Sequence, residues 1–384
     1  MTSRTSPSPK LLATSKLKTV HLEVTSKCNL RCTYCAVSQP GYKGYDLDID
    51  SLDPLLDDLH TLNVEMVCLN GHGETTFHAG WKDVFRKVVG KFPVIWLTTN
   101  LAIDYSDEEI KLLSRIDQIV VSLDTHDPLL LQDTRRRVDL GMIMRNISRI
   151  RHASLARRED ELTPHFTFSC VVHDKNVLQL PAFAHFVVSL HASHVDFCNL
   201  TKYSDLPGKV NVYPVSSLTN TDDLVNARES LKTAETILAD NGVTSAIQDG
   251  LLASIDEAIA NSWRKDAPRP LTVDIVKQPH AATLSAQRNF RTPKKGETRD
   301  CLDPWEFSII YATGKVAPCC WHEPLHTLGK DGSLLDILSS EKTIKLRKQL
   351  LSGRLNKFCK TCPARGLIST HGLRKKVIAR NRNK

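Results

Sequence analysis

Short apolar segments alternate with amphipathic segments through the first half of the chain. Six apolar segments have the length and composition of β-strands, and they cover residues 20–24, 64–70, 94–98, 119–123, 166–172 and 195–200. The segments between them follow helical spacing or begin with a helix cap. Such alternation indicates parallel strands joined by right-handed crossovers. Because six units are fewer than a full TIM barrel contains, the sequence predicts an α/β fold with a partial (β/α)6 TIM-like barrel, open on one side.

The 11 cysteines are distributed in groups. Three lie near the start, five lie near the end, and Cys68, Cys170 and Cys198 are isolated between them. The number is odd, no apolar secretory signal precedes the barrel, and a chain of this size needs no disulfide to stabilise its core. We therefore expect a reducing, cytoplasmic location and thiolates that bind metal.

The first group, Cys28, Cys32 and Cys35, has the spacing CxxxCxxC and follows the first predicted strand. Active sites of such barrels lie at the carboxyl ends of the strands, which is where this loop begins. A cubane [4Fe–4S] cluster takes four ligands, so three local thiolates leave one iron for another ligand. Zinc is the alternative, but a zinc site needs a fourth residue nearby, and His21 belongs to the strand itself.

This motif, with Tyr34 before the last cysteine, resembles the signature of the radical S-adenosylmethionine (SAM) enzymes. The resemblance implies that Cys28, Cys32 and Cys35 hold the cluster and that SAM chelates the fourth iron. It also implies that Tyr34 lies near the adenine. In that family, an electron from the cluster cleaves SAM to methionine and a 5′-deoxyadenosyl radical, which takes a hydrogen atom from the substrate. The resemblance implies the same partial barrel as the strand pattern.

A glycine-rich turn over residues 69–75 follows the second predicted strand. Glycines allow a backbone to approach a ligand closely, and Glu74 can accept hydrogen bonds from an ammonium group. The turn resembles the GGEP motif of the family, which contacts the SAM amino group, although Thr75 replaces the usual proline. We therefore expect Gly73 and Glu74 to bind the cofactor. An ordinary turn is the alternative.

Polar residues also follow the third and fourth strands. Asn100, Ser122 and Asp124 lie at positions where a barrel presents ligand-binding groups, and the family resemblance places SAM or substrate near the last two. Helix or Asx caps are the alternative for Asn100 and Asp124. Arg135, in a run of three arginines, is our candidate for the SAM carboxylate, with a solvated charged segment as the alternative. Cys198, near the end of the sixth strand, is a candidate hydrogen donor, although isolated cysteines in strands are usually buried apolar residues.

The second group of cysteines flanks a predicted β-hairpin over residues 307–320. Cys301, Gly314, Cys319 and the pair Cys359 and Cys362 are similar in arrangement to SPASM and twitch domains. The resemblance implies that these four cysteines hold one auxiliary [4Fe–4S] cluster, since no further cysteine follows Cys362. A zinc ribbon is the alternative, and the sequence does not decide whether Cys320 replaces Cys319.

These patterns divide the chain into five expected regions. They are a disordered N-terminal tail (1–17), the barrel with added helices at 221–240 and 245–262 (18–262), a linker (263–300), the auxiliary domain (301–366) and a basic tail (367–384). The net charge of +8 is spread along the chain, so we do not expect a nucleic-acid partner. The sequence contains no run of about 18 apolar residues, so we do not expect a membrane span.

The resemblance therefore implies a radical SAM oxidoreductase or transferase that acts on an unactivated carbon. Few residues precede the barrel, which favours a small-metabolite substrate over a peptide with a leader sequence. Peptide maturation and cleavage of SAM to a 3-amino-3-carboxypropyl radical are the alternative reactions. The expected redox partner is an electron donor such as flavodoxin or ferredoxin. A metal-binding module that contacts nucleic acid is the non-enzymatic alternative.

Overall fold

The computed structural model describes residues 9–13, 16–156, 164–200, 210–248, 250–266, 291–362 and 364–382. Within these ranges, one sheet has the strand order β13 (His326–Thr327), β12 (Lys315–Ala317), β11 (Phe307–Ile310), β1 (Thr19–Leu22), β3 (Met66–Leu69), β4 (Val94–Thr99), β5 (Gln118–Ser122), β7 (His165–Val172), β8 (His194–Asn199) and β9 (Thr244–Ile247). All neighbours from β11 to β9 pair in parallel, and β12 and β13 pair antiparallel. The edge strands β13 and β9 do not pair with each other, so the barrel is open.

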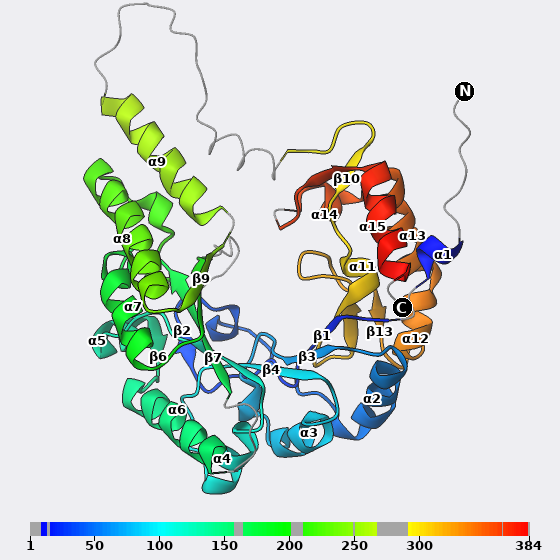
Figure 1. The fold of residues 1–384 in the computed structure, drawn as a ribbon, viewed down its shortest axis with the longest axis horizontal. Coiled ribbons are helices and arrows are strands. Elements are labelled where there is room, and N and C mark those ends of the chain that lie inside the picture. The colour runs from blue at the N-terminus through cyan, green and yellow to red at the C-terminus, as the bar shows by residue number, and fades with distance from the viewer. Residues whose placement is uncertain are drawn as a thin grey trace, which may run out of the picture.

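Helices cover the outer face of this sheet (Figure 1). They are α2 (Leu52–Thr61), α3 (Trp81–Val88), α4 (Asp107–Leu113), α5 (Pro128–Thr134), α6 (Leu140–Leu155), α7 (Leu180–Ser189) and α8 (Thr221–Asp240). A further helix, α9 (Leu251–Asp266), packs on α8. The six parallel strands β1, β3, β4, β5, β7 and β8, with crossover helices between them, confirm the predicted partial (β/α)6 barrel.

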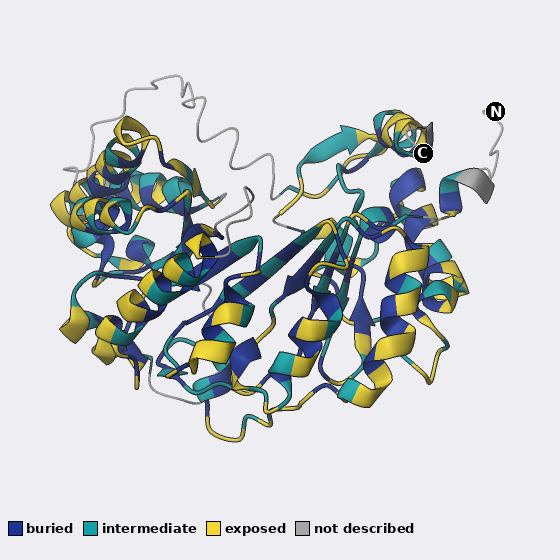
Figure 2. Cartoon of the chain, turned by 60° about the horizontal axis from the view of Figure 1, so that its bottom comes forward, coloured by how far each residue is buried: buried dark blue, intermediate teal, exposed yellow. Residues whose placement is uncertain are grey.

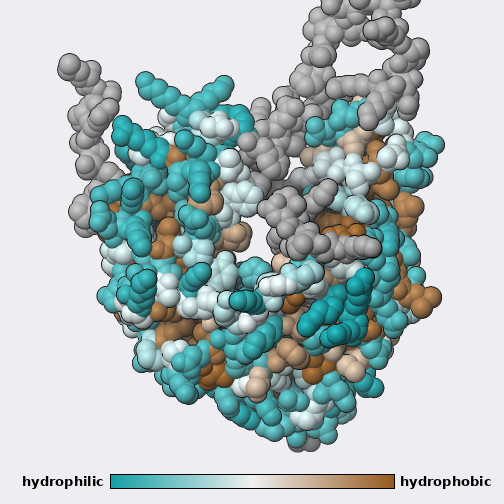
Figure 3. All heavy atoms as spheres, turned by 180° about the vertical axis from the view of Figure 1, so that it is seen from behind, coloured by the Kyte–Doolittle hydropathy of each residue, from teal (hydrophilic) through white to brown (hydrophobic). Residues whose placement is uncertain are grey.

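The helices form where the sequence pattern places them because one side of each is apolar. In α2, Leu52, Leu55, Leu56 and Leu59 are buried at helical spacing, and they belong to the core cluster that also contains alternate strand residues. The predicted capping box between Ser106 and Glu109 begins α4. Figure 2 shows the exposed residues on the outer sides of the helices. Hydrophilic residues also cover most of the surface seen from behind in Figure 3.

One predicted helix begins later than the pattern indicates. The segment 245–262 was expected to be wholly helical, but Thr244–Ile247 forms β9, which pairs in parallel with β8. The helix α9 begins at Leu251. The carbonyl of Phe197 accepts a hydrogen bond from the Gln248 amide at 2.9 Å, which continues the pairing with β8. An open edge of β8 was available, and this tertiary pairing outweighed local helical spacing.

The cysteine-rich C-terminal part is not separate from the barrel sheet. The predicted hairpin is present, with Ile309 opposite Ala317 and Ile310 opposite Val316. Its first strand, β11, pairs in parallel with β1, with Phe307 opposite Thr19. The hairpin thus extends the sheet on the side opposite β9. The strands β11, β12 and β13 of the region expected at 301–366 thus belong to the same sheet as the barrel strands.

Both chain ends pack on this C-terminal part. In the segment expected to be a disordered tail, residues 1–8 and 14–15 lie outside the described residues, but Pro9–Leu12 forms helix α1. Leu12 joins a second core that includes Trp305 and Leu350. The indole nitrogen of Trp305 donates to the Leu11 carbonyl at 2.9 Å. The expectation of disorder is therefore wrong for α1, because aromatic and leucine side chains distant in sequence bury it.

The basic C-terminal tail is also structured. Leu367–Ser369 forms β14, which pairs antiparallel with β10 (Glu297–Arg299), and Thr370–Arg382 forms helix α15. Leu373 and Val377 are buried in the second core against α13 (Glu341–Ser352). The charged side chains indicated a solvated tail, but the apolar side of the segment stabilises a helix.

The linker expected at 263–300 is structured at both ends. Helix α9 continues to Asp266, and β10 begins at Glu297. The residues between 267 and 290 lie outside the described ranges. None of the helices in the described ranges is long and apolar enough to cross a membrane.

Candidate active site and metal centres

The loop that carries the first three cysteines follows β1 at the carboxyl end of the sheet. Cys28 and Cys35 are half-buried and Cys32 is buried. Arg31–Cys32 forms the short strand β2, which pairs antiparallel with β6 (Arg135–Arg136). Cys32 lies directly opposite Arg135 in this pair. The small ladder therefore holds the cysteine loop against the segment that follows β5.

Hydrogen-bond donors surround the sulfur of Cys28. The Leu30 amide lies 3.4 Å from Cys28 Sγ, and Asn100 Nδ2 lies 3.8 Å from the same atom. Burial raises the pKa of Cys28 to about 11 and that of Cys32 to about 12. Cys35 lies near enough to raise both pKa values further. These thiols are neutral in the metal-free chain, so a metal must release their protons when it binds.

The three thiols of the cysteine loop are the candidate ligands of a metal centre. Within the described ranges, no three His, Cys, Asp or Glu side chains are close enough to hold one metal ion. Tetrahedral zinc needs its ligands around one centre. A cubane instead distributes its thiolates over separate irons. Cys28, Cys32 and Cys35 lie near enough to one another to raise each other's pKa values, and thiolates are the usual protein ligands of such a cluster, so the residues present fit a [4Fe–4S] cluster.

The glycine-rich turn packs directly against the cysteine loop. A Cβ atom at Gly73 would lie 2.2 Å from the Lys27 carbonyl oxygen and 2.5 Å from the Thr25 carbonyl oxygen. The Glu74 amide donates to that Lys27 carbonyl at 2.8 Å. Only glycine allows this close approach, so the two loops form one unit at the barrel mouth.

The carboxylate of Glu74 is buried and surrounded by donors of the chain itself. Its Oε1 accepts from the hydroxyls of Thr76 at 2.7 Å and Thr99 at 2.8 Å, and its Oε2 accepts from the Asn100 amide at 2.7 Å. Burial raises the pKa of Glu74 despite these bonds. The carboxylate joins the turn to the end of β4, and its contact with a SAM ammonium stays a prediction.

Asp124 and Arg135 form a buried ion pair below the cysteine loop. Arg135 Nε and Nη2 each donate to the Asp124 carboxylate at 2.7 Å, and the Tyr34 hydroxyl donates to the same group. Burial by itself raises the pKa of Asp124, but the Arg135 guanidinium outweighs it and holds that pKa below its usual range. The guanidinium carbon lies 5.7 Å from the Tyr34 ring centre. The predicted contacts of Tyr34 with adenine and of Arg135 with the SAM carboxylate stay predictions.

Polar residues line the inner side of the strands that continue from this pair. Val121, Phe168 and Phe197 are fully buried in the core beneath the helices. Because successive strand residues face opposite sides, Ser122, Ser169 and Cys198 lie on the other face, where each is partly exposed. Ser122 is opposite Ser169 in the register, and Cys198 Sγ lies 3.5 Å from Ser169 Oγ. Burial raises the pKa of Cys198, which keeps its thiol neutral.

The second group of cysteines lines one cavity of about 60 Å³. Cys301, Cys319, Cys359 and Cys362 all contribute, and the exposed Cys320 lines it as well. These cysteines come from the loop before α11 (Asp303–Glu306), the end of the hairpin, and the loop around α14 (Lys357–Lys360). The fold thus brings the four predicted ligands together, along with one additional thiol.

Hydrogen bonds distinguish Cys319 from Cys320. The backbone amides of Trp321 and His322 donate to the Cys319 sulfur, although burial still raises the pKa of Cys319 to about 11. The Cys301 sulfur likewise accepts from the Asp303 amide. The Cys320 sulfur accepts from its own backbone amide, so one such bond stands against two for Cys319. Charge-assisted bonds of this kind stabilise a thiolate, so Cys319 is the better prepared ligand.

Comparison with known families follows the same division of the chain. The profile of the Radical SAM superfamily matches residues 22–183, and that of the iron–sulfur cluster-binding SPASM domain matches residues 301–363. The chain contains a radical SAM domain. Its C-terminal part is a SPASM domain, and the predicted cofactors, [4Fe–4S] clusters and SAM, are confirmed by these two domains.

Two curated relatives match only part of this chain. The tungsten-containing aldehyde ferredoxin oxidoreductase cofactor-modifying protein of Pyrococcus furiosus is 28% identical over 201 residues, which are 51% of this chain and 54% of that protein. The GTP 3′,8-cyclase of Chlorobaculum tepidum is 26% identical over 133 residues, which are 34% and 40% of the two chains. This chain thus spans about half or less of each relative.

Solved structures share the fold. Streptococcus suis SuiB bound to S-adenosylmethionine has a TM-score of 0.58 at 13% identity, covering 86% of this chain and 67% of that one. Native anSMEcpe with bound AdoMet has a TM-score of 0.56 at 15% identity, covering 95% of this chain and 99% of that one. At these identities the likeness shows the fold alone.

Two residues of this radical SAM chain that shape the site were not predicted from the sequence. Glu23 lies at the end of β1 and bonds both the glycine-rich turn and the end of β11. Arg299 is 1% exposed and donates to the Cys359 and Lys360 carbonyls at 2.9 and 2.6 Å, which holds the CxxC loop. An acidic residue shortly before the CxxxCxxC motif was the one available signal for Glu23. Nothing local distinguished Arg299 from the surface arginines.

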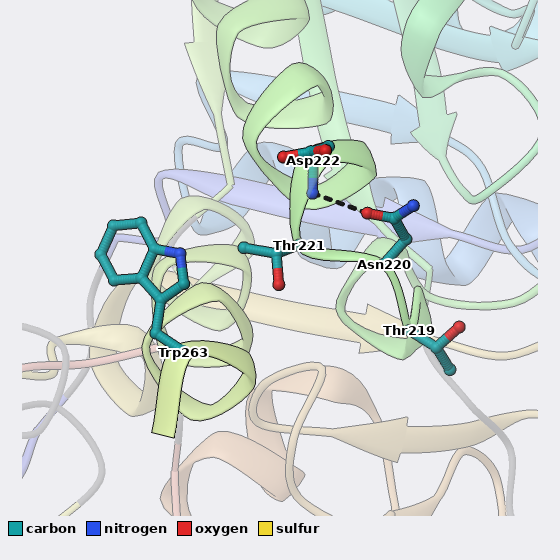
Figure 4. A pocket seen from close by; sticks show the side chains of 5 residues that line it. All are labelled: Thr219, Asn220, Thr221, Asp222 and Trp263. Carbon is teal, nitrogen blue, oxygen red and sulfur yellow. Dashed lines mark hydrogen bonds between the residues drawn. The ribbon is translucent and has the colours of Figure 1, made fainter. Parts of the chain in front are cut away.

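A larger open hollow of about 570 Å³ has no cysteine among its lining residues (Figure 4). It is lined by Thr219, Asn220, Thr221, Asp222 and Trp263, at the start of α8 and near the end of α9. The Asn220 side chain accepts from the Asp222 amide at 2.8 Å, which makes it the cap of α8. The Asn220 side chain is thus occupied in capping the helix, and none of the predicted site residues lines the hollow.

Proposed function

We propose that this chain cleaves SAM reductively and abstracts a hydrogen atom from an unactivated carbon of a small polar metabolite. The observation that carries this proposal is the packing of the Gly73 turn onto the loop of Cys28, Cys32 and Cys35. When bound, the [4Fe–4S] cluster supplies the electron that converts SAM to methionine and the 5′-deoxyadenosyl radical. Three thiolates leave one corner of a cubane for the amine and carboxylate of SAM.

The residues around that corner would bind and orient SAM. The turn at Gly73 would approach the amino group through its backbone, and Tyr34 would lie against the adenine. Asn100, which lies 3.8 Å from Cys28 Sγ through its amide nitrogen, would contact SAM at the end of β4. The Asp124–Arg135 pair would hold Tyr34 in place from below.

The inner wall of the open barrel supports a polar substrate. Ser122, Ser169 and Cys198 present two hydroxyls and a thiol on one face. Asp196, opposite Ser169 in the register, adds a carboxylate whose side chain is 37% exposed. A wall of this composition would bind hydroxyl or amino groups of a substrate by hydrogen bonds.

Cys301, Cys319, Cys359 and Cys362 would hold the auxiliary cluster, which would supply an electron acceptor near the substrate. In an oxidation the substrate would lose one hydrogen atom to the 5′-deoxyadenosyl radical, and then a proton to water and one electron to that acceptor. If the substrate radical is instead reduced, the Cys198 thiol would return a hydrogen atom, which gives an epimerised product and a Cys198 thiyl radical. One electron from the flavodoxin- or ferredoxin-type donor and one proton from water would then restore the thiol. The first route would make the chain an oxidoreductase, and the second would make it an epimerase.

Cleavage of SAM would use one electron from the first cluster, so an electron donor must reduce that cluster again before the next cleavage. Arg31 and Arg136 lie opposite each other in the β2–β6 ladder, next to Cys32, and Arg136 and Arg137 are exposed. Like charges in direct cross-strand positions are unfavourable. We infer that an acidic partner such as flavodoxin or ferredoxin docks there and offsets this repulsion.

A peptide substrate is the second candidate. SuiB has also been solved with its precursor peptide SuiA, and anSMEcpe with a peptide, although these likenesses concern the fold. The name of the Pyrococcus relative, which modifies a cofactor, favours a smaller substrate. The polar inner wall would be sufficient to bind a small metabolite, whereas a peptide substrate would need a groove.

The test is anaerobic reconstitution followed by iron counting and reaction with dithionite and SAM. Two cubanes give about eight irons per chain, and 5′-deoxyadenosine should form. Replacing Cys28, Cys32 and Cys35 by alanine should remove about half the iron and all of the nucleoside. The matched control is Cys68→Ala, a buried strand cysteine outside both groups. Bound zinc without nucleoside would support the non-enzymatic alternative instead.

A further inference from the structure

A single buried carboxylate lies where three segments of the chain meet. Glu23 is 3% exposed and follows β1. Its Oε1 accepts from the His72 amide at 2.7 Å and lies 3.1 Å from His72 Nδ1, in the glycine-rich turn after β3. Its Oε2 accepts from the Ala312 amide at 3.0 Å, just after β11. One oxygen thus bonds the SAM-binding turn, and the other bonds the C-terminal part.

The Glu23 side chain packs closely against the glycine-rich turn. A Cβ atom at Gly71 would lie 2.5 Å from Glu23 Oε1, so the turn closes onto the carboxylate only because glycine is present. The Glu23 amide donates to the Ile310 carbonyl at 2.8 Å. On the surface side, the rings of His72 and Tyr311 stack with centres 6.0 Å apart. The turn and the end of β11 therefore contact each other both directly and through Glu23.

The charge of Glu23 is stabilised by these same contacts. Burial opposes ionisation, but hydrogen bonds from His72 and from the Ala312 amide hold the pKa of Glu23 below its usual value. The Glu23 contact raises the pKa of His72. A buried carboxylate is costly unless donors satisfy it. Here the described donors come from the two segments on either side of β1, so a shift of either segment would leave the charge with fewer hydrogen bonds.

We propose that Glu23 is a positioning residue that couples the SAM-binding turn to the auxiliary-cluster domain. The proposal rests on the proposed function, because it takes the Gly73 turn as the SAM site. Hydrogen bonds to a charged group contribute enough free energy to transmit such a coupling. SAM affinity then depends on the integrity of the auxiliary half, although that half does not form the SAM site.

The experiment measures SAM binding by equilibrium dialysis on anaerobically reconstituted protein, without turnover. Glu23→Gln keeps the side-chain volume, but its NH2 group cannot accept a hydrogen bond, so one of the two donor contacts is lost. We therefore expect SAM affinity to fall about tenfold or more. The control is Glu65→Gln, because Glu65 pairs with Lys16 in an exposed salt bridge at the opposite end of the strands. Unchanged SAM affinity in Glu23→Gln would overturn the proposal.

A double-mutant cycle tests the coupling itself. Cys359→Ala, which removes the auxiliary cluster, should weaken SAM binding in the wild-type background and have little further effect in Glu23→Gln. Additive losses would contradict the coupling. If Glu23→Gln does not fold, His72→Phe decides the point, because it keeps the stack on Tyr311 and removes only the imidazole contact. We expect His72→Phe to reduce SAM affinity, and an unchanged affinity would refute the proposal.

The electron paramagnetic resonance signal of the reduced first cluster gives an independent readout. Addition of SAM should change this signal in the wild-type protein, and Glu23→Gln should need more SAM for the same change. A chain that binds SAM but forms no 5′-deoxyadenosine would disprove the proposed function and leave the coupling intact. The reverse result, normal nucleoside formation with SAM affinity independent of Glu23, would disprove only the coupling.

Discussion

The guanidinium of Arg135 meets the carboxylate of Asp124 at two points, with Nε and Nη2 each 2.7 Å from a carboxylate oxygen. Both side chains are buried, and Arg135 lies opposite Cys32 in the β2–β6 ladder. The ion pair therefore connects the cysteine loop to the inside of the barrel. Breaking one partner of such a pair leaves an uncompensated buried charge.

Asp124→Asn should destabilise the chain strongly for this reason. We expect a loss of about 3–5 kcal/mol in the free energy of unfolding, measured by urea denaturation of the metal-free protein. Asp133→Asn is the control, since the Asp133–Lys175 pair is half exposed and should contribute about 0–1 kcal/mol. Equal losses in the two variants would contradict a special role for the buried pair.

Cys319→Ser and Cys320→Ser should separate the two adjacent thiols. Cys319 accepts hydrogen bonds from two backbone amides, so Cys319→Ser should lose the auxiliary cluster and reduce the iron content by about four per chain. Cys320→Ser should keep the full iron content. Iron analysis and absorption spectra after reconstitution give the answer. Loss of iron in the Cys320 variant alone would assign the ligand to Cys320.

Cys198→Ser tests whether the Cys198 thiol faces the site of radical formation. In deuterium oxide the thiol exchanges to S–D, and a radical formed without substrate can take deuterium from it. The 5′-deoxyadenosine made by the wild-type chain should then contain deuterium, and the Cys198→Ser product should contain less, as measured by mass spectrometry. Cys68→Ala is the control. Identical deuterium content in all three proteins would place Cys198 out of reach.

Arg136→Glu should slow the reduction of the first cluster by reduced flavodoxin. Reversal of one exposed charge beside Cys32 should lower the rate about tenfold at low salt, and less at high salt. Reduction by dithionite, a small molecule that needs no docking surface, should be unchanged. Arg115→Glu, an exposed position after α4, is the control. A rate loss shared by both variants would indicate a general effect of charge.

Much of the architecture could be predicted because it depends on local patterns. The alternation of strands and helices predicted the six parallel strands of the partial barrel. The CxxxCxxC spacing placed Cys28, Cys32 and Cys35 on one loop at the carboxyl end of β1. Capping residues such as Ser106 marked a helix start correctly. In each case the physical cause, either side-chain periodicity or a hydrogen bond to a near neighbour, lies within a few residues.

The predictions failed where distant segments decide the outcome. Residues 245–247 satisfied a helical pattern, yet β8 had an open edge and they joined it. Residues 9–12 and the basic C-terminal segment were expected to be tails, but the second core around Trp305 and Leu350 buries one side of each. Local composition contains no information about a partner surface that forms only after folding.

The amino-acid sequence by itself determined the class of the molecule, because three thiols on one short loop and a repeated strand–helix period need no distant partner. The tertiary structure alone decided that β11 extends the barrel sheet beside β1. It also decided that the Glu23 carboxylate reaches Ala312, which is 289 positions away. The physical reason is that parallel strand pairing and buried charge satisfaction depend on groups brought together by the whole fold, and no local spacing specifies them.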